Sequence, residues 1–137
     1  MDQEFMIGIE EIDTQHRELL ERMDLLRDHL RRGQSRDAIR DALKFLDAYV
    51  AEHFATEVRY MQRYSYPGLL QHKAEHEVFL KDFAALKDKF TTLYAQGEMT
   101  TFLGVDIVRK LNEWFTDHIA TVDAKMGTYL AGKMPQR

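Results

Sequence analysis

The amino-acid sequence predicts an all-α protein, an up-down-up-down antiparallel four-helix bundle with an N-terminal arm. In four long segments, apolar residues recur at alternating steps of three and four positions, the spacing of a helix face that packs in a bundle. No segment shows the alternation with a period of two that is typical of half-buried strands. The segments are separated only by short stretches rich in turn residues, as expected for antiparallel neighbours.

The first helix is predicted at about residues 9–32, after an arm formed by residues 1–8. Gly33 suits the position that follows a helix, because glycine adopts a positive φ without steric cost. Ser35 can then cap a second helix at about residues 36–64. The apolar seams of these two helices contain Ile9, Ile12, His16, Leu19, Met23, Leu26 and Leu30, and then Ile39, Leu43, Leu46, Val50, His53, Glu57 and Tyr60.

Pro67 and Gly68 end the second helix, and a third is predicted at about residues 69–96, before Gly97. The fourth helix is predicted at about residues 101–121, with Thr100 or Thr101 as its cap. The seams of these helices contain Leu69, His72, His76, Phe79, Phe83, Leu86, Phe90 and Leu93, and then Ile107, Leu111, Trp114 and His118. With no long linker, residues 1–137 are predicted to form a single domain.

Composition narrows the possible functions. A net charge of −4 gives no support for nucleic-acid binding, and no apolar run reaches the roughly 18 residues of a membrane span. The acidic start does not resemble a secretory leader, so we expect a cytoplasmic location, and the charged outer faces favour a monomer. Cysteine is absent, which excludes disulfides, thiolate metal sites and cysteine nucleophiles. A bound metal would therefore need histidine and carboxylate ligands, which suit iron, zinc, manganese or cobalt.

The placement of histidine is the most informative feature. A single histidine on an apolar seam would be interpreted as a hydrogen-bonded core residue, but each buried imidazole without a partner costs about 1–3 kcal/mol, so several approach the whole stability of a domain. A metal ion resolves this conflict, because it binds the neutral imidazoles. The sixth histidine, His29, lies beside the first seam and is predicted to be a surface residue. The five histidines on the seams are His16, His53, His72, His76 and His118.

Two pairs of candidate ligands flank the turn between the second and third helices. His53 and Glu57 form one pair and His72 and His76 the other, each with a spacing of four residues. Residues four apart lie on the same face of a helix, so each pair can bind one ion from a single face. Spacing alone thus places the two members of each pair together, and the turn between the helices would fold one pair back against the other.

The motifs Gly8-Ile-Glu-Glu-Ile-Asp-Thr-Gln-His16, His53-Phe-Ala-Thr-Glu57, His72-Lys-Ala-Glu-His76 and Trp114-Phe-Thr-Asp-His118-Ile-Ala-Thr-Val-Asp123 follow one another in this order. Together they resemble the hemerythrins, specifically the bacterial single-domain kind. The resemblance implies reversible dioxygen binding, for storage, delivery or sensing, at two iron ions bridged by an oxo or hydroxo group. It further implies that one ion is bound by three histidines and the other by two, with two carboxylates as bridges. The implied ligands are His16, His53, Glu57, His72, His76, His118 and Asp123.

Asp123 is included through this resemblance rather than through its spacing. It follows His118 by five residues, which on a regular helix separates the two side chains by about 140°. Both side chains can reach one cluster only if the fourth helix ends or distorts between them. Without the resemblance, Asp123 would be interpreted as a solvated residue on a helix face.

Five apolar residues near the ligands are candidates for lining an oxygen pocket, which must keep water and reductants away. Plain core packing explains each of them about equally well, because aromatic residues on seams usually belong to the core. They are Leu19, Phe54, Trp114, Phe115 and Ile119.

Three other functions fit parts of the sequence. A ferritin-like di-iron enzyme, or a protein that handles peroxide or nitric oxide, would also use a bundle, but ferritin-like sites are rich in carboxylates rather than histidines. The segment from His72 to His76 matches the H-x-x-E-H signature of zinc peptidases, in which Glu75 would act as the base. A gas-sensing module would require a separate protein partner. The excess of histidine favours dioxygen binding over catalysis.

Overall fold

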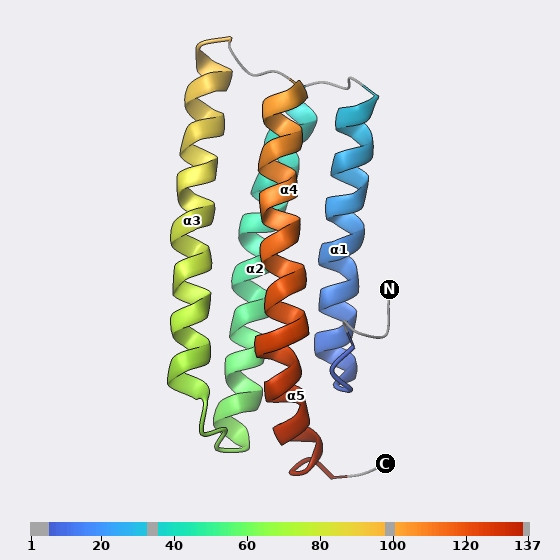
Figure 1. Cartoon of the computed structure of the whole chain (residues 1–137), viewed down its shortest axis with the longest axis vertical. Coiled ribbons are helices and arrows are strands. Elements are labelled where there is room, and N and C mark those ends of the chain that lie inside the picture. The colour runs from blue at the N-terminus through green and yellow to red at the C-terminus, as the bar shows by residue number, and fades with distance from the viewer. Residues whose placement is uncertain (1–5, 33–35, 98–100, 136–137) are drawn as a thin grey trace.

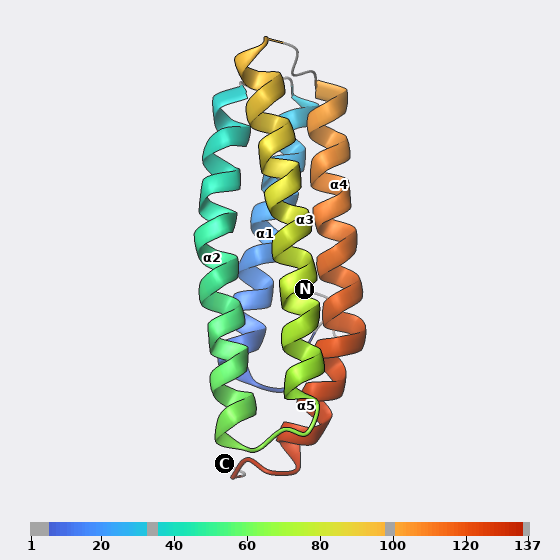
Figure 2. The same cartoon turned by 90° about the vertical axis from the view of Figure 1, so that its left-hand side faces the viewer.

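The computed structural model describes residues 6–32, 36–97 and 101–135. The helices α1 (Glu10–Arg31), α2 (Arg36–Arg63), α3 (Leu69–Ala95) and α4 (Thr101–His118) lie side by side, and successive helices run in opposite directions (Figures 1 and 2). The predicted all-α, up-down-up-down bundle is confirmed, and the described residues contain no strand.

The first three helices lie within about one residue of their predicted ends, and Gly97 has the positive φ of 70° expected after α3. The predicted helix ends at Gly33, Ser35 and Thr100 lie outside the described residues. The fourth helix is longer than predicted. Instead of ending at 121, it continues through a π-helical turn η2 (Ile119–Asp123) into α5 (Ala124–Ala131). The prediction ended too early because the apolar pattern changes phase at this turn.

The buried apolar residues form two clusters with a polar layer between them. On α1, His16 lies between Ile12 of one cluster and Leu19 of the other; on α2, Glu57 lies between Met61 and Phe54 in the same way. Burial of apolar surface in the two clusters provides the main stabilisation of the bundle. The polar layer is consequently held in place from both ends.

The arm is attached to the rest of the molecule by Asp13. This buried carboxylate accepts hydrogen bonds from the backbone N–H groups of Ile7, at 2.7 Å, and Gly8, at 3.1 Å. Gly127 lets the arm approach α5, since a Cβ atom on it would lie 2.7 Å from the Cβ of Ile7 and 2.8 Å from its carbonyl oxygen. The arm therefore packs into the apolar cluster that contains Ile12 and Met126.

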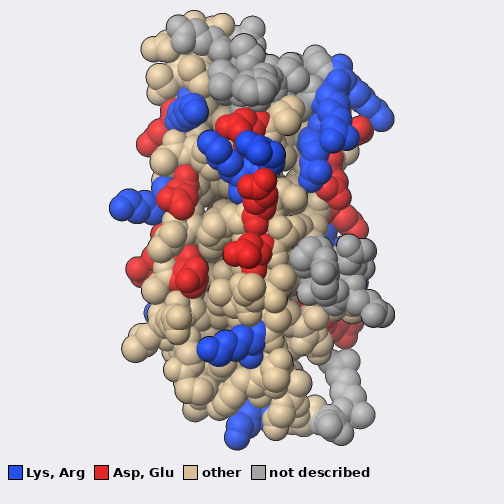
Figure 3. Space-filling model, viewed as in Figure 1, with Lys and Arg blue, Asp and Glu red and all other residues tan. Residues whose placement is uncertain are grey.

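On the face in Figure 3, acidic and basic side chains are interspersed. No helix within the described ranges is long and apolar enough to cross a membrane. His29, predicted at the surface, is partly buried and lines a groove between α1 and α2 with Arg22 and Phe45. It does not belong to the polar layer.

Candidate metal centre

All seven predicted ligands meet inside the bundle, and none is more than 4% exposed. Each of the four long helices contributes at least one, and the last comes from the end of η2. They form two overlapping groups, in each of which one donor atom per residue lies within 4.8 Å of the others. One group contains Glu57, His72, His76, His118 and Asp123, and the other contains His16, His53, Glu57 and Asp123.

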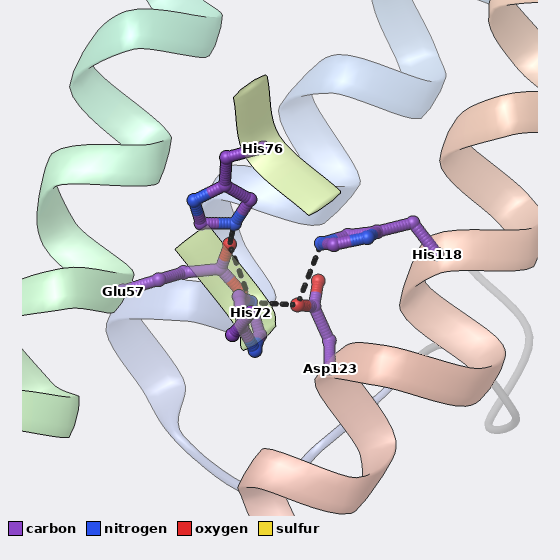
Figure 4. Close-up of side chains that lie close together, drawn as sticks. All are labelled: Glu57, His72, His76, His118 and Asp123. Atoms are coloured by element: carbon purple, nitrogen blue, oxygen red, sulfur yellow. Dashed lines mark hydrogen bonds and ion pairs between the residues drawn. The ribbon is translucent and has the colours of Figure 1, made fainter. Parts of the chain in front are cut away.

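The carboxylate of Asp123 lies between the two groups. Its Oδ1 atom is 3.0 Å from His72 Nε2 and 3.1 Å from His118 Nε2, whereas Oδ2 is 2.9 Å from His16 Nε2. One oxygen thus faces each group. Figure 4 shows this carboxylate pointing towards His72 and His118. An arrangement of this kind allows one carboxylate to bind two cations at once.

Glu57 lies opposite Asp123 and also belongs to both groups. Its Oε1 atom is 3.0 Å from His76 Nε2 and 3.6 Å from His72 Nε2 (Figure 4). The same atom is 3.6 Å from His53 Nε2. Its Oε2 atom is buried without a hydrogen-bond partner. The two carboxylates therefore enter the space between the imidazoles from opposite helices.

The π-helical turn explains how Asp123 reaches the cluster. In a π-helix, backbone hydrogen bonds join residues five apart, so side chains at that spacing lie on one face. Residues Ile119–Asp123 form this turn directly after His118. The predicted distortion between His118 and Asp123 is confirmed, and it takes the form of an extra residue within a continuous helix.

The unsatisfied atoms of the cluster test whether cations fit. The ring nitrogens Nδ1 and Nε2 of His16, His72 and His118, Nε2 of His53 and both oxygens of Asp123 are buried without an aligned hydrogen bond. Leaving such groups unpaired costs about 1–3 kcal/mol each. Two donors bound at right angles to one ion, with bonds of about 2.1 Å, lie about 3.0 Å apart, close to the observed contacts of 2.9 to 3.1 Å. The residues fit a pair of cations.

Electrostatics favours the ligand form of the histidines. Burial and the neighbouring imidazoles lower the pKa of His76 to about 3 and that of His53 well below its usual value. Burial and the nearby Asp123 raise the pKa of Glu57 well above its usual range. Burial alone would raise the pKa of Asp123 too, but the surrounding imidazoles hold it well below its usual range. Neutral imidazoles are the form that binds metal.

Aromatic rings cover one imidazole from α3 and the imidazole from α4. Phe54 stacks on His76 with ring centroids 3.7 Å apart, and Trp114 stacks on His118 at 4.6 Å. Phe115, by contrast, packs against Trp114 rather than against an imidazole. The remaining candidates for the pocket lining, Leu19 and Ile119, are fully buried.

Sequence reasoning missed two polar residues beside the cluster. Gln15 Oε1 lies 2.8 Å from His53 Nδ1, and Gln15 Nε2 donates to Thr56 at 3.0 Å. The available signal was their position inside the quoted motifs, next to His16 and Glu57 respectively. Glu75, the base expected for a peptidase, belongs to neither group of clustered donors.

Fold and site together define a four-helix bundle with a buried centre of histidines and carboxylates that can hold two cations. The family model described as hemerythrin HHE cation binding domain matches residues 7–130, so this chain belongs to the hemerythrin family. Similar curated proteins include a bacteriohemerythrin of Methylococcus capsulatus, which is 30% identical over 93% of this chain and 92% of its own. A bacteriohemerythrin of Ralstonia nicotianae is 36% identical over 69% of this chain and 67% of its own.

Solved structures agree with this assignment. A crystal structure of wild-type hemerythrin is similar to this chain with a TM-score of 0.76 and 31% sequence identity, covering 90% of this chain and 89% of that one. Because the likeness extends over nearly all of both chains, it includes the helices that contribute the cluster.

Proposed function

We propose that this protein binds dioxygen reversibly at a non-haem di-iron centre, with an oxo or hydroxo bridge between the ions. The observation that carries the proposal is the position of Asp123, which presents one oxygen to each of two groups of imidazoles. The bacteriohemerythrins and hemerythrin that resemble this chain provide independent support. When bound, the iron ions supply the reversible electron transfer that dioxygen binding requires.

The two groups of donors suggest how the ligands are divided. His72, His76 and His118 would hold one ion, His16 and His53 the other, and Glu57 and Asp123 would bridge them. Five imidazoles, two bridging carboxylates and one bridging oxygen would leave one ligand position free if both ions were octahedral. The ion held by His16 and His53 would have one histidine ligand fewer than the other, so dioxygen would bind on that side of the centre.

The protein itself keeps water and protons away from this centre. All seven candidate ligands are buried, and Phe54 and Trp114 cover the imidazoles of His76 and His118. Exclusion of water prevents side reactions at a reactive centre. The abundance of imidazole over carboxylate also favours binding over oxidation chemistry, so we propose a carrier rather than an enzyme.

Metal analysis combined with optical spectra tests the proposal. The purified protein should contain two iron ions per chain, and the reduced protein should gain an absorption band in air and lose it when oxygen is removed. A single zinc ion without such a band would contradict a di-iron oxygen carrier.

The substitution Glu75→Gln separates this function from that of a zinc peptidase. Glu75 lies outside the clustered donors, so metal content and spectra should not change. The matched variant Glu57→Gln removes a clustered carboxylate and should reduce the metal content. The reverse result would favour the peptidase.

A further inference from the structure

One imidazole of the cluster differs from its neighbours at the nitrogen that faces away from the other ligands. The Nδ1 atoms of His16, His72 and His118 are buried without a hydrogen-bond partner. The Nδ1 atom of His53 lies 2.8 Å from the side-chain oxygen of Gln15, on the neighbouring helix α1. The orientation of His53 is therefore constrained by a contact that these three ligands lack.

The amide of Gln15 is itself held in one direction. Its Nε2 atom donates a hydrogen bond to the hydroxyl oxygen of Thr56 at 3.0 Å. The hydroxyl of Thr56 donates to the backbone carbonyl of Glu52 at 3.0 Å, so its only hydrogen is already used. Thr56 can then only accept from other groups. The amide nitrogen of Gln15 must face Thr56, and the amide oxygen must face His53.

Arg59 reinforces this direction from the outer side of α2. Its Nη2 atom donates to Thr56 Oγ1 at 3.1 Å and to Glu11 Oε1 at 3.3 Å. A guanidinium group stays protonated and can only donate, so it cannot reverse the order of donors and acceptors. The direction of every hydrogen bond from Arg59 to Gln15 is thereby determined.

The chain of hydrogen bonds determines the state of His53. An amide oxygen can only accept, so the hydrogen of the neutral ring must lie on Nδ1. The lone pair is then on Nε2, the atom 3.6 Å from Glu57 inside the cluster. A ring that binds metal through Nε2 must be neutral, which agrees with this arrangement.

We propose that Gln15 is a positioning residue, held by Thr56, that sets the tautomer and orientation of His53 as a ligand of the two-histidine ion. This inference rests on the proposed function, in which that ion carries the open position. A neutral amide withdraws the Nδ1 hydrogen less than a carboxylate would, so it orients the ring while raising its basicity less. Gln15 also lines an open surface cavity of about 840 Å³ with Glu11 and Tyr60, so the hydrogen-bond chain joins the centre to the surface.

The first test compares Gln15→Leu with Gln15→Glu. Leucine removes the oxygen that accepts the hydrogen bond from His53 Nδ1, whereas glutamate keeps an acceptor at this position. Nitrogen NMR of the histidine rings in metal-free and Zn²⁺-loaded protein reports the tautomer directly. Wild type and Gln15→Glu should show hydrogen on Nδ1 of His53, and Gln15→Leu should lose this preference in the metal-free protein. Competition with a chelator should show about a 10- to 100-fold loss of Zn²⁺ affinity in Gln15→Leu, recovered in Gln15→Glu.

Gln62→Leu is the matched control, because Gln62 is an exposed glutamine on α2. It should leave both the tautomer and the Zn²⁺ affinity unchanged. An unaltered tautomer in Gln15→Leu, or an equal loss of affinity in Gln62→Leu, would overturn the proposal.

A second variant covers the case in which Gln15→Leu does not fold. Thr56→Val keeps the amide but removes the group that directs it, so the amide can turn its nitrogen towards His53. The His53 tautomer should then be mixed, and Zn²⁺ affinity should fall less than in Gln15→Leu. A single, unchanged tautomer in Thr56→Val would contradict the directional chain. The tautomer is measured without iron or dioxygen. Its result can therefore be interpreted even if the protein proves not to be an oxygen carrier.

Discussion

The two sides of the cluster hold the same type of ligand in different ways. On the side of α1 and α2, His53 is oriented by a hydrogen bond to Gln15, and the chain of polar contacts reaches the surface. On the side of α3 and α4, His76 and His118 are covered by the stacked rings of Phe54 and Trp114. Hydrogen bonds specify which nitrogen binds, whereas stacking fixes the ring plane and excludes water. The two sides therefore fix their imidazoles by different means.

The largest expected effect comes from Asp123→Ala, because Asp123 is in contact with both sides. We expect loss of both metal ions, since the variant removes one carboxylate oxygen from each group of donors. Metal analysis of the purified protein measures this. Asp117→Ala is the control, as Asp117 is exposed and directly precedes His118 in the sequence. Retention of one ion would show that the two sides bind metal independently.

Acid should destabilise the metal-free protein through both sides of the cluster. The folded state binds a proton on His76 only near pH 3, whereas the unfolded chain does so near 6.5. His53 behaves in the same direction, so the unfolded chain holds more protons in this range and stability falls as pH falls below about 6.5. Glu57 has a raised pKa and opposes this effect, but with one proton against two.

Measuring the free energy of unfolding of the metal-free protein with a denaturant at pH 7 and pH 5 tests this prediction. The free energy of unfolding should be lower at pH 5, and Glu57→Gln, which removes the opposing group, should steepen the loss. Constant or rising stability on acidification would mean that the buried imidazoles are stabilised as cations.

Removing a ring from the aromatic side should weaken the fold. Phe54 is buried, stacks on His76 and contacts Phe79 and Trp114. We expect Phe54→Ala to lower the free energy of unfolding by about 3–5 kcal/mol, through lost burial and the resulting cavity. Urea denaturation tests this, with the partly buried Phe45 as a matched position at which alanine should cost less. Equal costs would show that neither the deeper burial nor the stacking of Phe54 adds to stability.

The smallest effect is expected where the arm meets α5. Gly127→Ala would place a Cβ atom 2.7 Å from the Cβ of Ile7, so the arm must shift. A cost of about 1–3 kcal/mol follows for overpacking at this site. Gly132→Ala is the control, because its Cβ would meet only a carbonyl oxygen at 3.6 Å. A neutral Gly127→Ala would mean that the arm is held by Asp13 alone.

Much of the fold and part of the site can be predicted from the spacing of residues along the sequence. The steps of three and four predicted four helices, and the i, i+4 spacing brought Glu57 beside His53 and His72 beside His76. Asp123 could not be found in this way, because regular helix geometry turns it away from His118. Gln15 was missed because its partner His53 lies on another helix, 38 residues away, and pairing between helices leaves no local period.

The π-helical turn also affects the register of the helix that follows it. Buried positions before the turn include Leu111, Phe115 and His118, and those after it include Met126 and Leu130. The second set is displaced by one residue from the seven-residue repeat of the first, equivalent to a rotation of about 100°. Deleting one residue within η2 would restore an ordinary repeat, in which Met126 and Leu130 still lie on the helix face that packs in the bundle. The π-helical turn therefore absorbs the extra residue, so the apolar face of α5 stays in register with that of α4.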